Sequence, residues 1–244
     1  SGKISLAKTD IRSPFTDAST GSDVTSSTAG TGGIASVWNI LYLPRSVDIT
    51  LPNQHPITGE SIWYRGGNDR TNPVWVLNNT QDKQSTDRVF TNFVASYEAA
   101  DWLNFSYRLG IDSQNSRSRR VINKGSNDGL HPNGYLQTTS ERFTIWDQSL
   151  LASLDKELSE DFAIQATIGA TTKRQVFERD GSESRDQIIY GLWNHLNFSN
   201  SSTIIEGTVF ADNNQTYQTF SEQNNVAAYV SGTLSYKNYL YLNT

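Results

Sequence analysis

The chain has 244 residues, with 20 basic and 25 acidic side chains and a net charge of −5. It contains no cysteine, which excludes disulfides, thiolate metal sites and a cysteine nucleophile. The acidic balance argues against nucleic-acid binding, because phosphate contacts need a basic surface. Aromatic residues make up 11% of the chain, too many for a disordered protein, while charged residues make up only 18%. This composition is typical of a β protein with long polar loops.

The sequence has no run of about 18 apolar residues and so predicts no transmembrane helix. Ser1–Asp10 lacks the basic start and apolar core of a signal peptide. A membrane-crossing β-strand needs only about 9–11 residues of alternating character, so a membrane location stays open. Because the chain has no methionine and begins at Ser1, we expect a processed chain or a fragment.

The first third of the chain predicts irregular structure. Asp17–Gly33 is rich in Ser, Thr, Gly and Asp and indicates a loop. Apolar residues at helical spacing predict a short helix over Gly33–Leu43, which Pro44 ends. Asp48–Asn79 predicts short extended pieces broken by prolines and glycines.

Strict alternation of apolar and polar residues begins at Trp102–Asp112 and predicts a strand with one apolar and one polar face. Arg88–Tyr97 is also strand-like and is separated from it by the tight turn Glu98–Asp101. The same pattern returns in Phe162–Ala170 and Val226–Tyr236. Phe143–Leu154 fits an amphipathic helix slightly better by period, but its place in a series of hairpins favours a strand.

The connections alternate between short and long. Short turns are expected at Glu98–Asp101, Lys156–Asp161 and Lys237–Asn238, and long polar links at Ser113–Ser140, Thr171–Gln187 and Asp212–Asn224. Aromatic residues gather at the short turns, namely Tyr97, Trp102, Phe162, Tyr236 and Tyr239. Both features are typical of an outer-membrane barrel with short periplasmic turns, long extracellular loops and an aromatic girdle. A soluble β-sandwich remains the alternative on pattern alone.

Five segments resemble the SusC/RagA family of TonB-dependent outer-membrane transporters, in the same order along the chain. They are YLPRSVDITLP at 42–52, NPVWVLNN at 72–79, DRVFTNFVASYEAADWLNFSYRLGID at 87–112, SEDFAIQATIGA at 159–170 and SYKNYLYLNT at 235–244. The resemblance implies an all-β fold, an antiparallel transmembrane β-barrel of about 22 strands with a plug in its lumen. It also implies residence in the bacterial outer membrane.

The resemblance implies TonB-dependent import of nutrient oligomers, glycan fragments more often than peptides, with no cofactor. Its implied partners are a SusD-like surface lipoprotein, the TonB complex, and outer-membrane lipid and lipopolysaccharide. We expect barrel strands, a long loop and the short helix in residues 1–86, and consecutive hairpins in 87–244, with the plug and the TonB box outside this chain. The alternative function is a soluble secreted β-sandwich that binds carbohydrate.

We expect no enzyme activity. The three histidines lie far apart in the sequence and form no metal-ligand motif, and the carboxylate clusters fall in turns or loops.

Candidate contact residues follow from the strand pattern and from the aromatic residues. Substrate contacts are expected from aromatic rings with polar neighbours, at Trp63, Tyr64, Asn68, Arg70 and Trp75. Lumen-facing residues are expected at Asn104, Ser106, Arg108, Gln165 and Thr167, and lipid-facing residues at Leu103, Phe105, Leu109, Ile111, Ile164 and Ile168. Arginine forks that could bind lipopolysaccharide phosphates are Arg117, Arg119 and Arg120.

Overall fold

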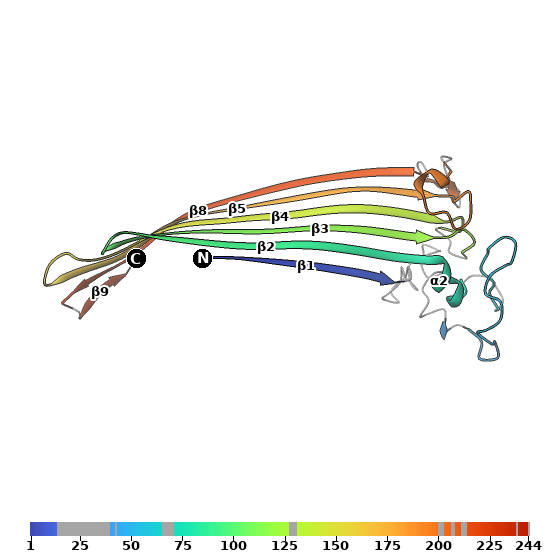
Figure 1. Cartoon of the computed structure of the whole chain (residues 1–244), viewed down its shortest axis with the longest axis horizontal. Coiled ribbons are helices and arrows are strands. Elements are labelled where there is room, and N and C mark those ends of the chain that lie inside the picture. Colours follow the sequence, from blue (N-terminus) through green and yellow to red (C-terminus); the bar gives the residue numbers. More distant parts are fainter. Residues whose placement is uncertain are drawn as a thin grey trace.

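A computed structural model describes residues 1–13, 40–41, 43–64, 71–126, 131–199, 203–205, 208–210, 214–237 and 239–243. Seven strands form one antiparallel sheet in the order β1-β2-β3-β4-β5-β8-β9 (Figure 1). Their bounds are β1 Gly2–Ser13, β2 Thr80–Ala100, β3 Leu103–Ile122, β4 Tyr135–Glu157, β5 Phe162–Arg185, β8 Asn214–Tyr236 and β9 Leu240–Asn243. β6 (Thr203–Ile205) and β7 (Thr208–Phe210) pair separately. The expected fold class, all-β with an antiparallel sheet, is confirmed.

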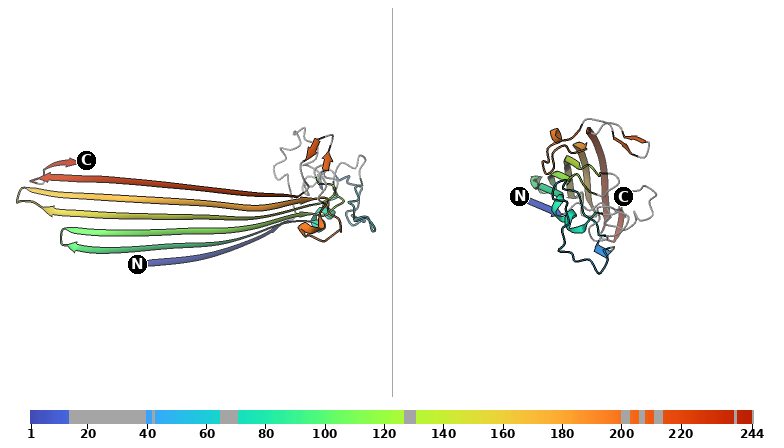
Figure 2. Two further views of the ribbon diagram at one scale, coloured as in Figure 1. Left: turned by 90° about the horizontal axis from the view of Figure 1, so that it is seen from above. Right: turned by 90° about the vertical axis from the view of Figure 1, so that its right-hand side faces the viewer.

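The sheet is long and twisted, with the short turns at one end and the longer connections at the other (Figure 2). The predicted hairpins are confirmed, because β2 pairs with β3, β4 with β5, and β8 with β9. Phe143–Leu154 lies inside β4, so the expectation of a strand there is also correct. The period of the apolar residues slightly favoured a helix, but pairing with a neighbour on each side decides for the strand.

Cross-strand pairing carries the alternation of β3 over the whole sheet. Leu103, Phe105, Tyr107, Leu109 and Ile111 lie on one side, which we call the Leu103 face, and the residues between them lie on the Asn104 face. Directly paired residues share a face, so the Leu103 face continues through the neighbouring strands. There it includes Phe93, Trp146, Leu150, Ala152, Leu154, Ala166, Ile168, Ala170, Val226, Ala228 and Val230. We call this set, with the five β3 residues, the apolar belt.

The long polar links expected between hairpins are mostly strand, so that prediction is wrong. β3 runs to Ile122, β5 to Arg185, and β8 already begins at Asn214. Strands β2 to β5 and β8 contain 20–24 residues each, about twice the 9–11 that cross a membrane. Beyond the apolar belt both faces carry polar side chains, so the period of two disappears from the sequence while the backbone pairing continues.

Pairs of opposite charge join neighbouring strands in these polar halves. Arg142 lies 3.6 Å from Glu178 and Arg174 lies 2.9 Å from Glu222, both on the Leu103 face. On the Asn104 face Arg179 lies 3.2 Å from Glu141. Such exposed pairs contribute only about 0–1 kcal/mol each to stability. Their main effect is to favour this register of the strands over others.

The helical part of the fold also differs from expectation. Asn72–Asn79, expected to be extended, contains the helix α2 (Pro73–Asn79). The helix expected over Gly33–Leu43 lies almost entirely outside the described residues. None of the helices in the described part of the chain has the length and apolarity to cross a membrane.

The buried core lies at the loop end of the sheet. One cluster joins Trp75 and Val76 of α2 with Ile122 and Tyr135 at the ends of β3 and β4. A second joins Val121 and Leu136 with Phe198 and the partly buried Trp193. Because Ile122 and Val121 point to opposite faces, residues outside the sheet pack against both of its faces at this end.

Candidate ligand-binding site at the loop end of the sheet

Helix α2 begins where its sequence signals a start. The Asn72 side chain accepts a hydrogen bond from the Val74 amide at 2.9 Å, and Pro73 occupies the first helical position. The helix ends at Thr80, whose hydroxyl donates to the Val76 carbonyl at 2.8 Å before the chain enters β2. The short helix thereby seats Trp75 against the end of the sheet.

Trp75 is a core residue. Its side chain is completely buried, and its indole N–H donates to the Gly59 carbonyl at 2.8 Å. A buried and hydrogen-bonded indole offers no face to a ligand. The expectation that Trp75 contacts substrate is therefore not met in this structure, because the ring is packed against Ile122 and Tyr135 in the core.

The other expected substrate contacts divide into two groups. Trp63 is 9% exposed, and its indole N–H has no hydrogen-bond partner among the described residues. Tyr64 is half-buried and donates to the Pro52 carbonyl at 2.7 Å. Asn68 and Arg70 lie outside the described residues. The described members are thus mainly packing residues beneath the loops.

Asn123 is the hub of a buried amide network just past β3. Its side-chain oxygen accepts from the Trp193 indole at 2.7 Å, from Gln187 at 3.2 Å and from the Gly191 amide at 3.1 Å. Its side-chain nitrogen donates to Asn79 at 3.2 Å. The network joins the 186–199 loop to the ends of α2 and β3 and fixes the shape of the loop end.

A hollow of about 600 Å³ opens among these loops. It is lined by both charged and polar groups, including Glu60, Lys124, Asn133 and Tyr190. The Tyr190 hydroxyl donates to Asn79 and accepts from Gln54, and burial raises the pKa of Tyr190 above its ordinary value. A cavity with a carboxylate, an ammonium group and a neutral phenol can bind a ligand that carries both charges.

Gly59 allows Tyr190 to reach this position. A Cβ at Gly59 would lie 2.5 Å from the tyrosine ring, and the residue has φ +78°, which favours glycine. The close approach of backbone and ring forms one wall of the hollow. No periodic signal marks Gly59, Asn123 or Tyr190 in the sequence, so analysis of the sequence missed them.

The 186–199 loop docks on the Leu103 face through His195. The imidazole lies between two strand hydroxyls, 2.9 Å from Thr138 Oγ1 and 2.8 Å from Ser184 Oγ. Burial and then the Arg119 charge lower the pKa of His195. The ring therefore favours its neutral form when docked.

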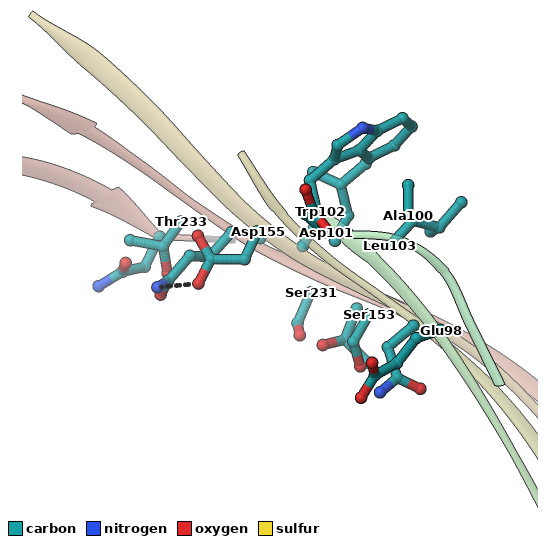
Figure 3. Close-up of a pocket in the computed structure, with 16 residues that line it drawn as sticks. Glu98, Ala100, Asp101, Trp102, Leu103, Ser153, Asp155, Ser231 and Thr233 are labelled. Carbon is teal, nitrogen blue, oxygen red and sulfur yellow. Dashed lines mark hydrogen bonds between the residues drawn. The ribbon is translucent and has the colours of Figure 1, made fainter. Parts of the chain in front are cut away.

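The five residues expected to face the lumen share the Asn104 face. Asn104, Ser106 and Arg108 alternate on β3, and Gln165 and Thr167 continue the face on β5. A second hollow of about 710 Å³ lies here at the short-turn end (Figure 3). Asn104, Gln165 and Thr167 line it, and Gln165 donates to Asp155 at 3.1 Å.

The six residues expected to face lipid all lie on the Leu103 face, as do their belt neighbours. They are Leu103, Phe105, Leu109, Ile111, Ile164 and Ile168. Several side chains of the belt are exposed: Ile168 is 61% exposed, Val226 80% and Val230 66%. An apolar surface this large is a sign of contact with a membrane or a partner.

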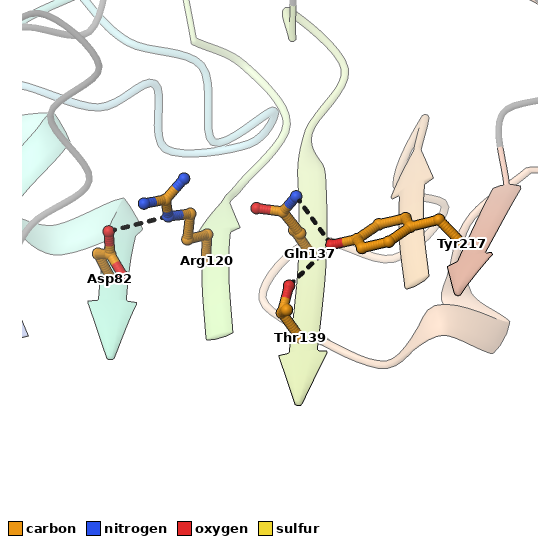
Figure 4. Close-up of polar contacts among 5 residues, drawn as sticks. All are labelled: Asp82, Arg120, Gln137, Thr139 and Tyr217. Carbon is orange, nitrogen blue, oxygen red and sulfur yellow. Dashed lines mark hydrogen bonds and ion pairs between the residues drawn. The ribbon is translucent and has the colours of Figure 1, made fainter. Parts of the chain in front are cut away.

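The three arginines expected as lipopolysaccharide contacts are divided between the two faces. Arg117 and Arg119 lie on the Leu103 face, but Arg120 lies on the Asn104 face, 3.0 Å from Asp82 (Figure 4). Arg119 is further engaged, donating to the Trp193 carbonyl and lying 5.8 Å from its ring centre. The structure therefore separates Arg120 from the other two, because alternate strand residues point in opposite directions, and contact with lipopolysaccharide stays a prediction.

In the part of the chain that the structure describes, no group of three or more His, Asp or Glu side chains is arranged to hold a metal ion.

Solved structures provide the comparison for this fold. The RagAB peptide transporter matches with a TM-score of 0.56 and 12% sequence identity, over 77% of this chain and 20% of that chain. The RagAB peptide importer in its closed-closed and open-open states matches over the same shares, at 12% identity and with TM-scores of 0.56 and 0.55. No protein-family model matches the sequence, and no curated protein matches it. The chain thus shares its fold with about a fifth of the RagAB transporter chain.

Proposed function

We propose that this chain forms part of the wall of a TonB-dependent importer of the SusC/RagA family in the bacterial outer membrane. Its role is the passage of nutrient oligomers, without catalysis. The observation that carries the proposal is the apolar belt on one face of a sheet whose other face is polar at the same level. The fold likeness to the RagAB peptide transporter supports it independently.

The size of the belt fits a bilayer. On β3 it spans nine residues from Leu103 to Ile111, the length of strand that crosses a membrane at a tilt. The Tyr107 hydroxyl inside the belt donates to Gln148 at 3.1 Å, so this buried donor would keep its partner in lipid. Aromatic rings border the belt at the short turns, where Phe162 and Tyr236 lie 4.8 Å apart. Such rings suit the level of the lipid headgroups.

The cargo we propose is a short oligomer, a peptide or an oligosaccharide. The indoles expected to stack on sugar rings, Trp63 and Trp75, are buried, which removes the specific argument for oligosaccharides. The hollow beside Tyr190 brings Glu60 and Lys124 together, a combination that suits a peptide with both charges. RagAB is a peptide transporter, so peptides are the first cargo to test.

The partners follow from the same proposal. A SusD-like surface lipoprotein would cover the loop end, where α2 and the 186–199 loop lie, and the TonB complex would act from the side of the short turns. A soluble β-sandwich that binds carbohydrate is the rival, and it requires a second sheet over the Leu103 face. Val226, Val230 and Ile168 remain open on that face, which favours the membrane proposal.

Two measurements test the function. The first is the intact mass of the protein and its location after detergent extraction of outer membranes, where we expect a polypeptide several times longer than this chain. The second is uptake of labelled short peptides and labelled oligosaccharides by cells that lack the gene and by cells in which it is restored. A soluble protein of only 244 residues would overturn the proposal, and uptake of one cargo class would decide the substrate.

A further inference from the structure

Three cations lie side by side across the polar half of the Leu103 face. Arg12 of β1 is the direct partner of Lys83 of β2, and Lys83 is the direct partner of Arg119 of β3. Like charges directly opposite one another destabilise a sheet. A row of three cations in a chain whose net charge is −5 therefore suggests an anionic ligand that offsets the repulsion.

Arg117 extends this row by one position toward the belt, on the same face. We call Arg12, Lys83, Arg117 and Arg119 the cationic row. Lys83 and Arg117 are exposed. Arg119 is oriented by the Trp193 carbonyl and ring. Arg12 meets the Gln81 side chain at 2.9 Å once the amide oxygen of Gln81 is turned toward it.

The acid two residues before Arg12 on the same face is already engaged. Asp10 accepts from the Ser85 hydroxyl at 2.6 Å and lies 3.9 Å from Lys8. Closer to the belt, Arg142 and Arg174 are paired with glutamates of neighbouring strands. The cationic row is thus the part of this face where positive charge is least balanced among the described residues.

The height of the row above the belt restricts which ligand can reach it. Arg119 lies eight positions beyond Ile111 on β3, about 26 Å along the strand at about 3.3 Å per residue. With the usual tilt of about 40° this is about 20 Å above the edge of the belt. A lipid of the outer leaflet can reach this level only through a phosphate carried on an extended head group.

We propose that the cationic row binds the phosphorylated saccharide of lipopolysaccharide, so that the lipid lies against the outside of the wall. The inference rests on the membrane orientation proposed above, with the Leu103 face outward. The guanidinium group of an arginine binds phosphate oxygens through two parallel hydrogen bonds. Lys83 adds a flexible positive charge between Arg12 and Arg119. Arg120 takes no part, because it lies on the other face and pairs with Asp82.

The test uses the intact protein purified in detergent and binding of purified lipopolysaccharide. The double variant Lys83→Gln/Arg117→Gln removes two exposed cations that make no hydrogen bond or ion pair among the described residues, so it should fold normally. We expect binding to weaken about tenfold and its dependence on salt to become shallower. Arg120→Gln is the matched control from the same strand and should bind like the unaltered protein.

Besides unchanged binding by the double variant, three results would overturn the inference. They are equal loss in Arg120→Gln, equal binding of dephosphorylated lipopolysaccharide, or full competition by millimolar inorganic phosphate, which would indicate a simple anion site. Cargo uptake measured on the double variant separates this inference from the proposed function. Retained uptake with unchanged lipopolysaccharide binding would contradict only the cationic row, whereas absence of the unaltered protein from the outer membrane would contradict both.

Discussion

Tyr217 of β8 lies across Gly181 of β5, its direct partner in the sheet. A Cβ at Gly181 would lie 2.2 Å from the tyrosine ring, so only glycine leaves room for it. The Tyr217 hydroxyl then reaches β4, 2.8 Å from Thr139 Oγ1 and 3.4 Å from Gln137 (Figure 4). Tyr229 lies across Gly169 in the same way, twelve positions along the same pair of strands. An aromatic ring over a strand glycine fills the space that a missing side chain leaves.

Gly181→Ala should therefore destabilise the sheet. The methyl group displaces Tyr217 and breaks its contacts with Thr139 and Gln137, at a cost of about 1–3 kcal/mol in the free energy of unfolding. The matched control is Gly110→Ala on the same face, because a Cβ there meets nothing closer than 3.7 Å. Urea unfolding of the protein in detergent or lipid measures both variants. Equal stability of the two would mean that Tyr217 does not depend on Gly181.

Charge placed on the belt should cost most at its centre. Leu150 is paired with Tyr107, which lies at the middle of the belt on β3. Leu150→Arg should therefore destabilise the protein in lipid, lowering its free energy of unfolding by about 2–4 kcal/mol. Leu109→Arg, one row nearer the edge, should cost less. Ser149→Arg is the control, because Ser149 is next to Leu150 in the chain but its side chain lies on the Asn104 face. Reversible folding into lipid vesicles gives all three values, and a cost that ignores depth would argue against lipid on the Leu103 face.

Loss of the Asn123 side chain should loosen the loop end. Asn123→Ala leaves the Trp193 indole, the Gln187 amide and the Gly191 amide without their shared acceptor. Buried donors left unpaired cost about 1–3 kcal/mol each, less what water restores. Faster hydrogen exchange across residues 186–199 is the expected readout. Asn92→Ala, on an exposed part of β2, should leave exchange unchanged.

Docking of the 186–199 loop should weaken as pH falls. Burial lowers the pKa of His195 in the folded state below its ordinary value of 6.5, so the undocked ring binds more protons. Stability therefore rises with pH between the lowered pKa and 6.5, and it is lost as pH falls through that window. Because intrinsic amide exchange is base-catalysed, the comparison uses protection factors, and we expect those of residues 186–199 to be lower at pH 5.5 than at pH 7.5. His195→Gln, which keeps a donor and an acceptor but does not titrate, should remove the difference.

The sequence alone determined the half of the sheet that lies next to the short turns. Alternation in Trp102–Asp112 and Phe162–Ala170 predicted both the strands and the two groups of residues that share a face. It could do so because one face there is apolar and the other polar, which leaves a period of two in the sequence. The short turns were found for the same reason, since they interrupt that period.

Only the tertiary structure decided the polar halves of the strands and the loop end. Where both faces carry polar side chains the sequence resembles a loop, and only backbone pairing with a neighbour keeps Ser113–Ile122 extended. Pairing also placed Arg12 and Lys83 beside Arg119, although they are distant in the chain, and turned Arg120 away. Trp75 and Asn123 acquired their roles through long-range burial, a property that no local pattern encodes.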